Sequence, residues 1–227
     1  MKIHKKTNER SDITYDYIFK SIFGSEENKY FTKRLIELIT GIKVEKIEVY
    51  QDATLEQYRR NEKTGRLDVK AIINDGIIIN IEMQNYNEGD IEYRTERYGT
   101  KIYANSINKG TQYKGAKEVI LINILNFRIN KHKEYLSKTV TVIEKHRETE
   151  IKTKLKYYFI ELPKVEGQKL NREDKLTQWL IYMRGKEKEE IEMIKEKNRD
   201  IRKLDKAIER VKKREERREN KNGRIKI

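Results

Sequence analysis

Two acidic side chains and one amide lie on a pair of apolar segments that an Asn-Asp-Gly turn joins. Residues 65–84 read GRLDVKAIINDGIIINIEMQ, with acids at Asp68 and Glu82 and an amide at Gln84. Two carboxylates placed opposite each other on a buried hairpin repel unless a cation lies between them. Hard oxygen ligands of this kind suit Mg2+ or, as an alternative, Mn2+. The pattern therefore predicts a divalent metal site suited to phosphodiester hydrolysis.

The alternation of side chains along a strand tests whether the acids meet. The polar side chains of one face are Arg66, Asp68, Lys70, Asn80, Glu82 and Gln84. A three-residue loop with a left-handed Gly76 pairs Ile73 with Ile77 and places Asp68 across from Glu82. Their β-carbons are then roughly 5 Å apart. A two-residue turn would shift the register by one and separate the acids. A half-exposed strand also alternates, but the run IIINI is too apolar for an edge ribbon.

The elements that must position this hairpin follow from periodicity and turn residues. We expect helices at 14–24, 25–41, 90–109 and 171–184. We expect strands at 44–50, 66–73, 77–84, 117–126 and 154–162, with a weaker one at 138–144. Residues 51–64 are polar and predict a loop that touches substrate. The order of elements after the hairpin predicts an α/β fold, with a mixed central sheet flanked by helices.

The composition indicates which partners, metals and compartment to expect for this chain. The formal charge is +14, and 40% of residues are charged. The pI near 9.6 favours a polyanionic partner such as nucleic acid. There is no cysteine, and His4, His132 and His146 show no ligand spacing, so zinc chemistry is not expected. No segment approaches the roughly 20 apolar residues of a membrane span. We therefore expect a cytoplasmic protein that contacts no membrane.

Further motifs accompany the hairpin in order along the chain. They are DYIFKSIFG at 16–24, RLDVKA at 66–71, IEMQ at 81–84, RTERYGTKIY at 94–103, KGTQY at 109–113, EVILINIL at 118–125, FIELPK at 159–164 and QWLIYM at 178–183. On these matches the chain resembles the Rpn family of recombination-promoting nucleases, also named transposases. That family belongs to the PD-(D/E)XK nuclease superfamily. The resemblance implies a restriction-endonuclease-like core, Mg2+-dependent endonucleolytic cleavage of DNA and a link to DNA recombination.

The resemblance also implies roles for single residues. Asp68 and Glu82 match the motif acids, and Gln84 stands at the position that is lysine in the usual pattern of the superfamily and glutamine in this branch. Our hypothesis for the metal ligands is Asp68, Glu82, the backbone carbonyl of Met83 and, through water, Asp16, for which an acid at a helix start that interacts with the helix dipole is the alternative. The candidate substrate contacts are Arg94, Tyr98 and Arg66, with packing of the helix on the sheet as the alternative for the first two. An amide cannot take up or release a proton near neutral pH, so Gln84 could hold a metal or orient a water but could not act as the general base. Lys70 is a candidate for the missing ammonium, with a solvated strand lysine as the alternative.

The composition changes after Gly185. Residues 1–185 form the expected nuclease-like domain, and residues 186–227 form a charged helical extension, truncated or divergent at its end. A thin apolar stripe along the extension consists of Ile191, Ile194, Ile201, Leu204, Ile208 and Val211. This spacing is typical of a coiled-coil seam, and a homodimer through the C-terminal helix is one reading. A partly frayed, solvated helix is the other.

Two alternatives to DNA cleavage stay open. A catalytically weak or inactive protein that keeps the nuclease fold would bind DNA or act in assembly, and both Gln84 and the irregular C-terminal tail motivate this reading. An RNA substrate is the other alternative. The chain has no GxxxxGK loop and no GxSxG elbow, so ATP-driven and serine-hydrolase functions have no support.

Overall fold

The computed structural model describes residues 12–55, 65–74, 76–107, 109–110, 112–166 and 170–223. The helices are α1 (Asp16–Phe23), α2 (Lys29–Thr40), α3 (Ile91–Asn105), α4 (Lys175–Arg184), α5 (Lys188–Lys197) and α6 (Arg199–Gly223). The strands are β1 (Ile47–Thr54), β2 (Arg66–Ile73), β3 (Ile77–Gln84), β4 (Val119–Leu125), β5 (Leu136–Lys138), β6 (Val142–Ile143), β7 (His146–Glu150) and β8 (Leu155–Glu161). Short 3-10 helices are η1 (Asp12–Thr14), η2 (Glu26–Asn28), η3 (Tyr113–Gly115) and η4 (Leu162–Val165).

A mixed sheet forms the centre of the molecule. Within the described chain it has six strands in the order β1-β2-β3-β4-β8-β5. β1, β2 and β3 are antiparallel neighbours, β3, β4 and β8 run parallel, and β5 returns antiparallel. β4 reads VILINIL and is buried throughout, as a parallel strand covered on both faces must be. The predicted α/β fold class is confirmed.

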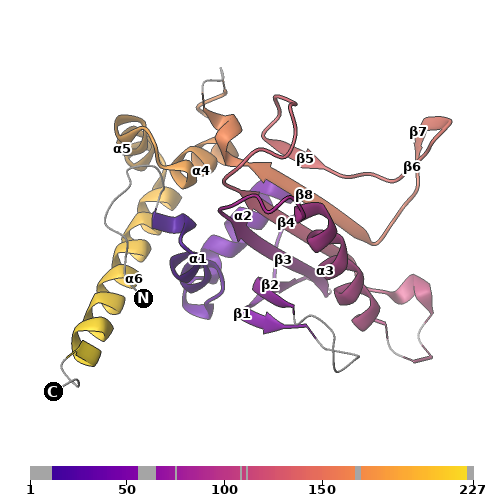
Figure 1. Ribbon diagram of the computed structural model, residues 1–227, viewed down its shortest axis with the longest axis horizontal. Coiled ribbons are helices and arrows are strands. Elements are labelled where there is room, and N and C mark those ends of the chain that lie inside the picture. The colour runs from indigo at the N-terminus through magenta and orange to yellow at the C-terminus, as the bar shows by residue number, and fades with distance from the viewer. Residues whose placement is uncertain are drawn as a thin grey trace.

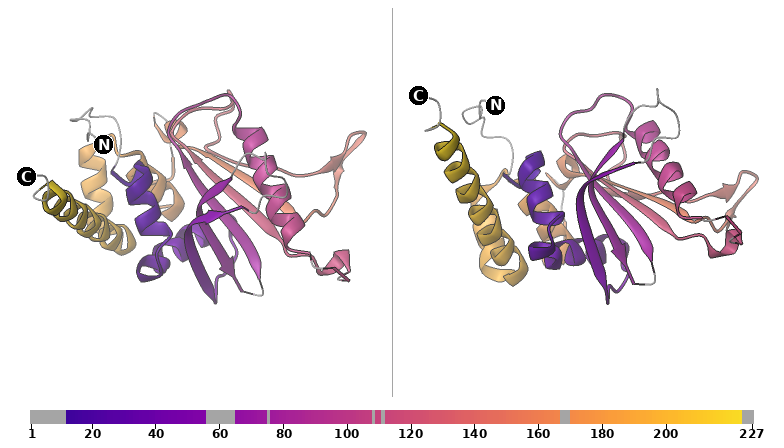
Figure 2. Two further views of the ribbon diagram at one scale, coloured as in Figure 1. Left: turned by 60° about the horizontal axis from the view of Figure 1, so that its bottom comes forward. Right: turned by 90° about the horizontal axis from the view of Figure 1, so that it is seen from below.

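Helices cover both faces of this sheet (Figures 1 and 2). α1, α2, α4 and α6 lie on one face and α3 on the other. The larger core draws on each helix of the first face and on the sheet, with Phe19, Leu35, Ile81, Trp179 and Leu204 as examples. On the second face Tyr98 and Ile102 of α3 pack with Leu67 and Leu121. No helix in the described parts of the chain combines the length and apolar character needed to cross a membrane.

The hairpin has the expected register. Ile73 pairs with Ile77 and Val69 with Ile81. Gly76 has a φ of 100°, a left-handed backbone that favours glycine. The pairing confirms a three-residue connection, although its middle residue, Asp75, lies outside the described residues.

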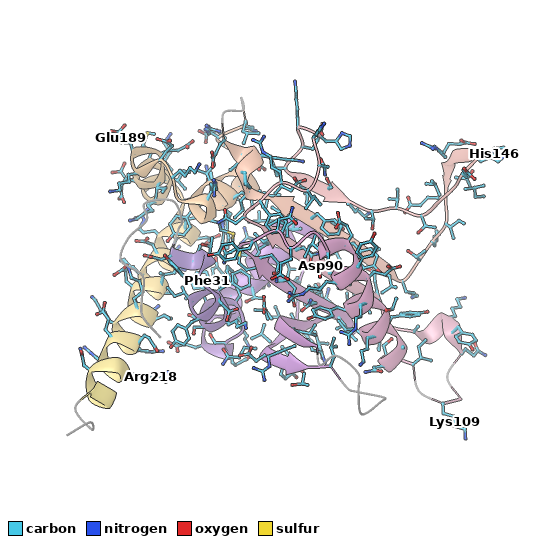
Figure 3. The ribbon with its side chains drawn as sticks, viewed as in Figure 1. Phe31, Asp90, Lys109, His146, Glu189 and Arg218 are labelled. Atoms are coloured by element: carbon cyan, nitrogen blue, oxygen red, sulfur yellow. The ribbon has the colours of Figure 1, made fainter. Side chains whose placement is uncertain are left out.

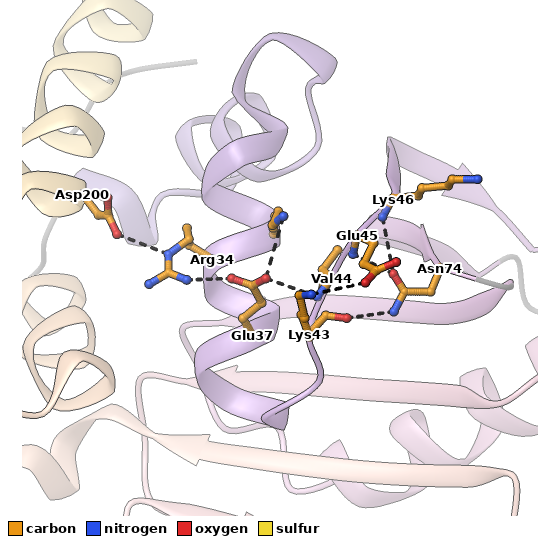
Figure 4. Close-up of polar contacts among 9 residues, drawn as sticks. Arg34, Glu37, Lys43, Val44, Glu45, Lys46, Asn74 and Asp200 are labelled. Carbon is orange, nitrogen blue, oxygen red and sulfur yellow. Dashed lines mark hydrogen bonds and ion pairs between the residues drawn. The ribbon is translucent and has the colours of Figure 1, made fainter.

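Asn74 fixes this turn against the segment before β1 (Figure 4). Its φ is 46°, and its Oδ1 accepts the N–H of Glu45 over 2.8 Å. Asparagine tolerates the left-handed region because its short side chain bonds to nearby backbone. The same figure shows Arg34 of α2 donating to Glu37 over 2.6 Å and to Asp200 of α6 over 3.2 Å. The bond to Asp200 ties the C-terminal helix to α2, which packs against β1.

Two expectations about strands were wrong. β1 runs on through Thr54, so residues 51–54 are strand and not loop. β1 is an edge strand with half-exposed polar side chains, and it therefore lacks the apolar run that marks a buried strand. The remainder of the expected loop, 56–64, lies outside the described residues. In place of one strand at 138–144 the chain forms β5, β6 and β7, of which β6 and β7 project as an arm (Figure 1).

The C-terminal helix α6 packs on the body of the molecule. Its buried side chains are Ile201, Leu204, Ala207, Ile208 and Val211, and all of them belong to the larger core. The apolar stripe read from the sequence is therefore used within the chain, against α1 and α5. A homodimer through this helix stays a proposal, and it would have to use the charged face.

Candidate functional site

Asp68 and Glu82 meet where β2 begins and β3 ends. One step beyond the pair Val69–Ile81, the same register sets Asp68 opposite Glu82. The N–H of Asp68 donates to Oε1 of Glu82 over 3.2 Å, and the N–H of Met83 donates to Oδ2 of Asp68 over 3.2 Å. Only 7% of Asp68 and 2% of Glu82 is exposed. The expected convergence of the acids is observed, and their role as metal ligands stays a prediction.

The two acids are difficult to ionise together. Burial, followed by the nearby charge of Asp68, raises the pKa of Glu82 to about 7. Burial also raises the pKa of Asp68, against the lowering effect of Lys20. Both shifts mark carboxylates that have lost water without gaining enough positive charge. A pair of this kind favours a further cation.

Lys20 of α1 supplies the ammonium nearest to Asp68. Its Nζ lies 3.3 Å from Asp68, 2.9 Å from Asp16 and 3.0 Å from Asp52. Burial lowers the pKa of Lys20, but hydrogen bonds to Asp16 and Asp52 and the charge of Asp68 outweigh it, so the pKa lies above its ordinary value. Lys20 is therefore a permanent cation at neutral pH. Asp16 reaches Asp68 through this ammonium, and its own side chain is 70% exposed.

Sequence reasoning missed both Lys20 and Asp52. The spacing of Lys20 four residues after Asp16 predicts a pair on one helix face, but it does not show that this face meets β2. Asp52 has a φ of 51° and is skipped in the pairing of β1 with β2. A non-glycine residue in this region is strained, and such strain is concentrated at functional sites. No local pattern marks that backbone conformation in advance.

Arg94 of α3 holds the other acid. Its Nη2 donates to Oε2 of Glu82 over 3.0 Å, and its guanidinium lies 5.3 Å from the ring centre of Tyr98. Tyr98 is 8% exposed and packs in the core beside Leu67. Its place in the structure is packing beneath Arg94, and a direct contact with substrate stays a prediction. The buried Nε of Arg94 has no hydrogen-bond partner among the described residues.

Two amides surround Glu82. Nε2 of Gln84 donates to Oε2 of Glu82 over 3.4 Å, and Nδ2 of Asn80 donates to Oε1 over 3.1 Å. Oδ1 of Asn80 is buried and, within the described chain, has no donor. Lys70 pairs with Asn80 across the hairpin, but its ammonium lies over Tyr50, 5.9 Å from the ring centre. The ammonium at Asp68 thus belongs to Lys20, and the role of Lys70 stays a prediction.

The remaining expected residue, Arg66, is exposed at the start of β2, where it pairs with Thr54 of β1. It shares a strand with Asp68 and stays a predicted substrate contact. Among the residues that the structure describes, no three His, Asp or Glu side chains form a ready metal cage. A cation at this site would therefore rely on the two hairpin carboxylates, with backbone or water oxygens completing its shell.

A mixed sheet with helices on both faces, and with paired acids on its central hairpin, defines a restriction-endonuclease-like fold. A family model described as "PD-(D/E)XK nuclease family transposase" matches residues 13–227, and the chain belongs to this family. The match includes α5 and α6, beyond the last motif noted in the sequence. Comparison with curated proteins and with solved structures gives no match.

Proposed function

We propose that the protein is a divalent-metal-dependent endonuclease that hydrolyses phosphodiester bonds in DNA. The observation that carries the proposal is the convergence of Asp68 and Glu82, buried and bonded to each other's strands. Membership of the family supports nuclease activity in general. The net charge of +14 supports a polyanionic substrate. A part in DNA recombination is proposed from the family resemblance alone.

The side chains at the site fit a hard divalent cation, Mg2+ or Mn2+. The raised pKa values of Asp68 and Glu82 show two acids that a cation would stabilise. Oδ1 of Asn80, which has no donor among the residues that the structure describes, is a further buried oxygen beside Glu82. Asp68, Glu82 and the carbonyl of Met83 would hold the ion, with Asp16 acting through water. When bound, such an ion polarises a phosphoryl oxygen and lowers the pKa of a coordinated water.

Three neighbouring side chains have proposed roles in hydrolysis. Nε2 of Gln84 already donates to Glu82, so its Oε1 is the atom that accepts a hydrogen bond from the attacking water. Lys20 and Arg94 are cations on either side of the acids, and they stabilise the negative charge that develops on the phosphate. The water oxygen bonds to phosphorus and releases its proton to solvent, while the bond from phosphorus to the leaving oxygen breaks and that oxygen takes the electron pair and a proton from solvent.

A second candidate function is DNA binding without cleavage. Gln84 replaces the usual lysine with a group that cannot transfer a proton, and both acids already carry cationic partners. In this reading the site holds the fold together, and the basic surface binds the polyanion. The two functions predict the same salt-sensitive binding but opposite results for cleavage.

Supercoiled plasmid incubated with Mg2+ separates these functions. The native protein should nick or linearise the plasmid, and EDTA should stop the reaction. Asp68→Asn keeps the shape of the side chain and should lower the rate by at least about 100-fold, the upper end of the loss for residues that merely support a metal ligand. Salt-sensitive binding by a native protein that does not cleave would favour the second function. Competition with duplex RNA tests the RNA alternative.

A further inference from the structure

A basic loop begins beside the acids, at the end of the sheet where β3 and β4 terminate. Loop 126–134 follows β4 and reads NFRINKHKE. β3 and β4 are parallel, and the N–H of Asn126 donates to the carbonyl of Gln84 over 2.8 Å. The loop therefore leaves the sheet directly beside the end of the strand that carries Glu82.

A buried ion pair fixes the backbone of this loop. Glu161 at the end of β8 is 0% exposed, Lys164 of η4 is 2% exposed, and the two are 2.6 Å apart. Glu161 accepts the N–H of Ile129 over 2.8 Å and Nδ2 of Asn130 over 3.0 Å, while Lys164 donates to Oδ1 of Asn130 over 2.7 Å. A buried pair is costly unless its hydrogen-bonding capacity is satisfied. Here the loop satisfies it, and the loop in turn is held in one conformation.

The fixed loop presents two cations, Arg128 and Lys131, to solvent. Arg128, Lys131 and His132 are exposed and line a hollow of about 410 Å3 together with Ile129 and Asn130. Nη2 of Arg128 donates to the carbonyl of Pro163 over 3.3 Å, which orients the guanidinium and leaves its other donors for a ligand. Cations fixed around a hollow match the oxygens of a phosphate group.

We propose that loop 126–134 is a phosphate-binding platform that holds the DNA backbone beside the acids. The proposal rests on the proposed nuclease function and specifies where the DNA backbone lies on the protein surface. Strands lie about 4.8 Å apart, so β8 and the frame around Glu161 lie about 10 Å from β3. With about 3.4 Å of rise per nucleotide along one strand, the platform would contact phosphates about three nucleotides from the bond that is cut.

The arm formed by β6 and β7 offers a matched control. It carries Lys145 and Arg147, which are exposed, as are Lys131 and Arg128 in the loop. The arm leaves the sheet between the end of β5 and the start of β8. These two strand ends lie at the end of the sheet opposite the one from which the loop leaves. His146 marks its tip, far from the body of the molecule (Figure 3). Lys145→Gln/Arg147→Gln therefore removes one lysine and one arginine without altering the platform.

The test is binding of a fluorescent 25-base-pair duplex to the full chain in EDTA, measured at several salt concentrations. Arg128→Gln/Lys131→Gln should reduce the slope of log K against log salt by about 1.8, since each lost phosphate contact contributes about 0.9. The arm variant should keep the native slope. An unchanged slope in the loop variant, or equal changes in both variants, would overturn the platform.

Two further measurements distinguish loss of the platform from unfolding of the variant and from failure of the proposed nuclease function. The double variant Arg128→Gln/Lys131→Gln should unfold at the same temperature as the native protein. If it does not, the single variant Lys131→Gln is used instead, and it should reduce the slope by about half as much. Native protein that cleaves plasmid while the loop variant binds with native slope would overturn the platform alone. Native protein that binds no DNA would overturn both proposals.

Discussion

The ammonium of Lys20 lies 3.3 Å from Oδ1 of Asp68 and joins helix α1 to the acidic hairpin. The same nitrogen contacts Asp16 and Asp52. Lys20 therefore shares one positive charge among three carboxylates, one of which a divalent cation would also need. This arrangement makes the lysine a competitor for metal and, in the proposed mechanism, a partner in stabilising the phosphate.

Replacing Lys20 should therefore move metal affinity and cleavage in opposite directions. In Lys20→Met the affinity for Mn2+, measured by calorimetry, should rise about tenfold, because a nearby positive charge costs on the order of 1 kcal/mol or more. Plasmid cleavage should fall by about 100-fold, the loss typical of one electrostatic donor. Lys29→Met is the control, because Lys29 pairs with Glu26 at the start of α2 and forms no ion pair with Asp68 or Glu82. A parallel fall in metal affinity and cleavage would indicate that Lys20 only supports the fold.

Glu82 should make the stability of the protein pH-dependent in EDTA. Its pKa is raised from 4.5 to about 7 in the folded chain, so the folded state binds more protons between these values than the unfolded state. The stabilisation is fully present below about pH 4.5 and is lost as pH rises through about 7. Urea unfolding of the native protein should therefore show a free energy that falls between pH 5 and pH 7.5. Glu82→Gln should remove most of this fall.

Mn2+ affinity should depend on the ionisation of Glu82 in the direction opposite to that of stability. Metal ligands bind in their deprotonated form, so Mn2+ affinity should rise as pH increases through about 7. An affinity that is flat from pH 6 to pH 8 would contradict the assignment of Glu82 as a ligand.

The hairpin could be predicted because its signals are local. Strands of period two, an Asn-Asp-Gly turn and a left-handed glycine together fix one register, and that register sets Asp68 opposite Glu82. Helices α1, α2 and α4 also lie within the ranges 14–24, 25–41 and 171–184 that their apolar spacing predicts. These features depend on residues close together in sequence, which is where such patterns are most informative.

The electrostatic partners of the acids depend on contacts between distant elements. Lys20 and Arg94 come from opposite faces of the sheet, and no spacing in the sequence shows which cation reaches which acid. Lys70 lies on the same strand as Asp68, yet the ammonium of Lys70 lies over the ring of Tyr50 in β1. Asp52 depends on a strained backbone in an edge strand whose polar sequence predicts a loop. Tertiary packing determines each of these positions.

Helix α6 should contribute to the stability of the whole domain and not only of an extension. Leu204 is 0% exposed and belongs to the same core as α1, α2 and α4. Leu204→Ala should lower the free energy of unfolding by about 2–5 kcal/mol, measured by urea denaturation in a single transition. Lys206→Ala, an exposed position two residues further along the same helix, should change stability by less than about 0.5 kcal/mol. A separate early transition that alone responds to Leu204→Ala would show that the extension folds independently.

Gly99 should control how closely α3 approaches the sheet. A β-carbon at this position would lie 2.9 Å from Cδ1 of Leu121 and 2.9 Å from Cε1 of Tyr157, closer than real β-carbon contacts allow. Gly99→Ala should therefore push α3 outward and destabilise the fold by about 1–3 kcal/mol, despite the better helix propensity of alanine. Thr100→Ala, an exposed neighbour on the same helix, is the control and should be nearly neutral. Because α3 carries Arg94, which lowers the pKa of Glu82, the outward shift should also raise that pKa. The pH dependence of unfolding in EDTA measures this effect, and a Gly99→Ala protein with native stability and a native pH profile would contradict the close approach.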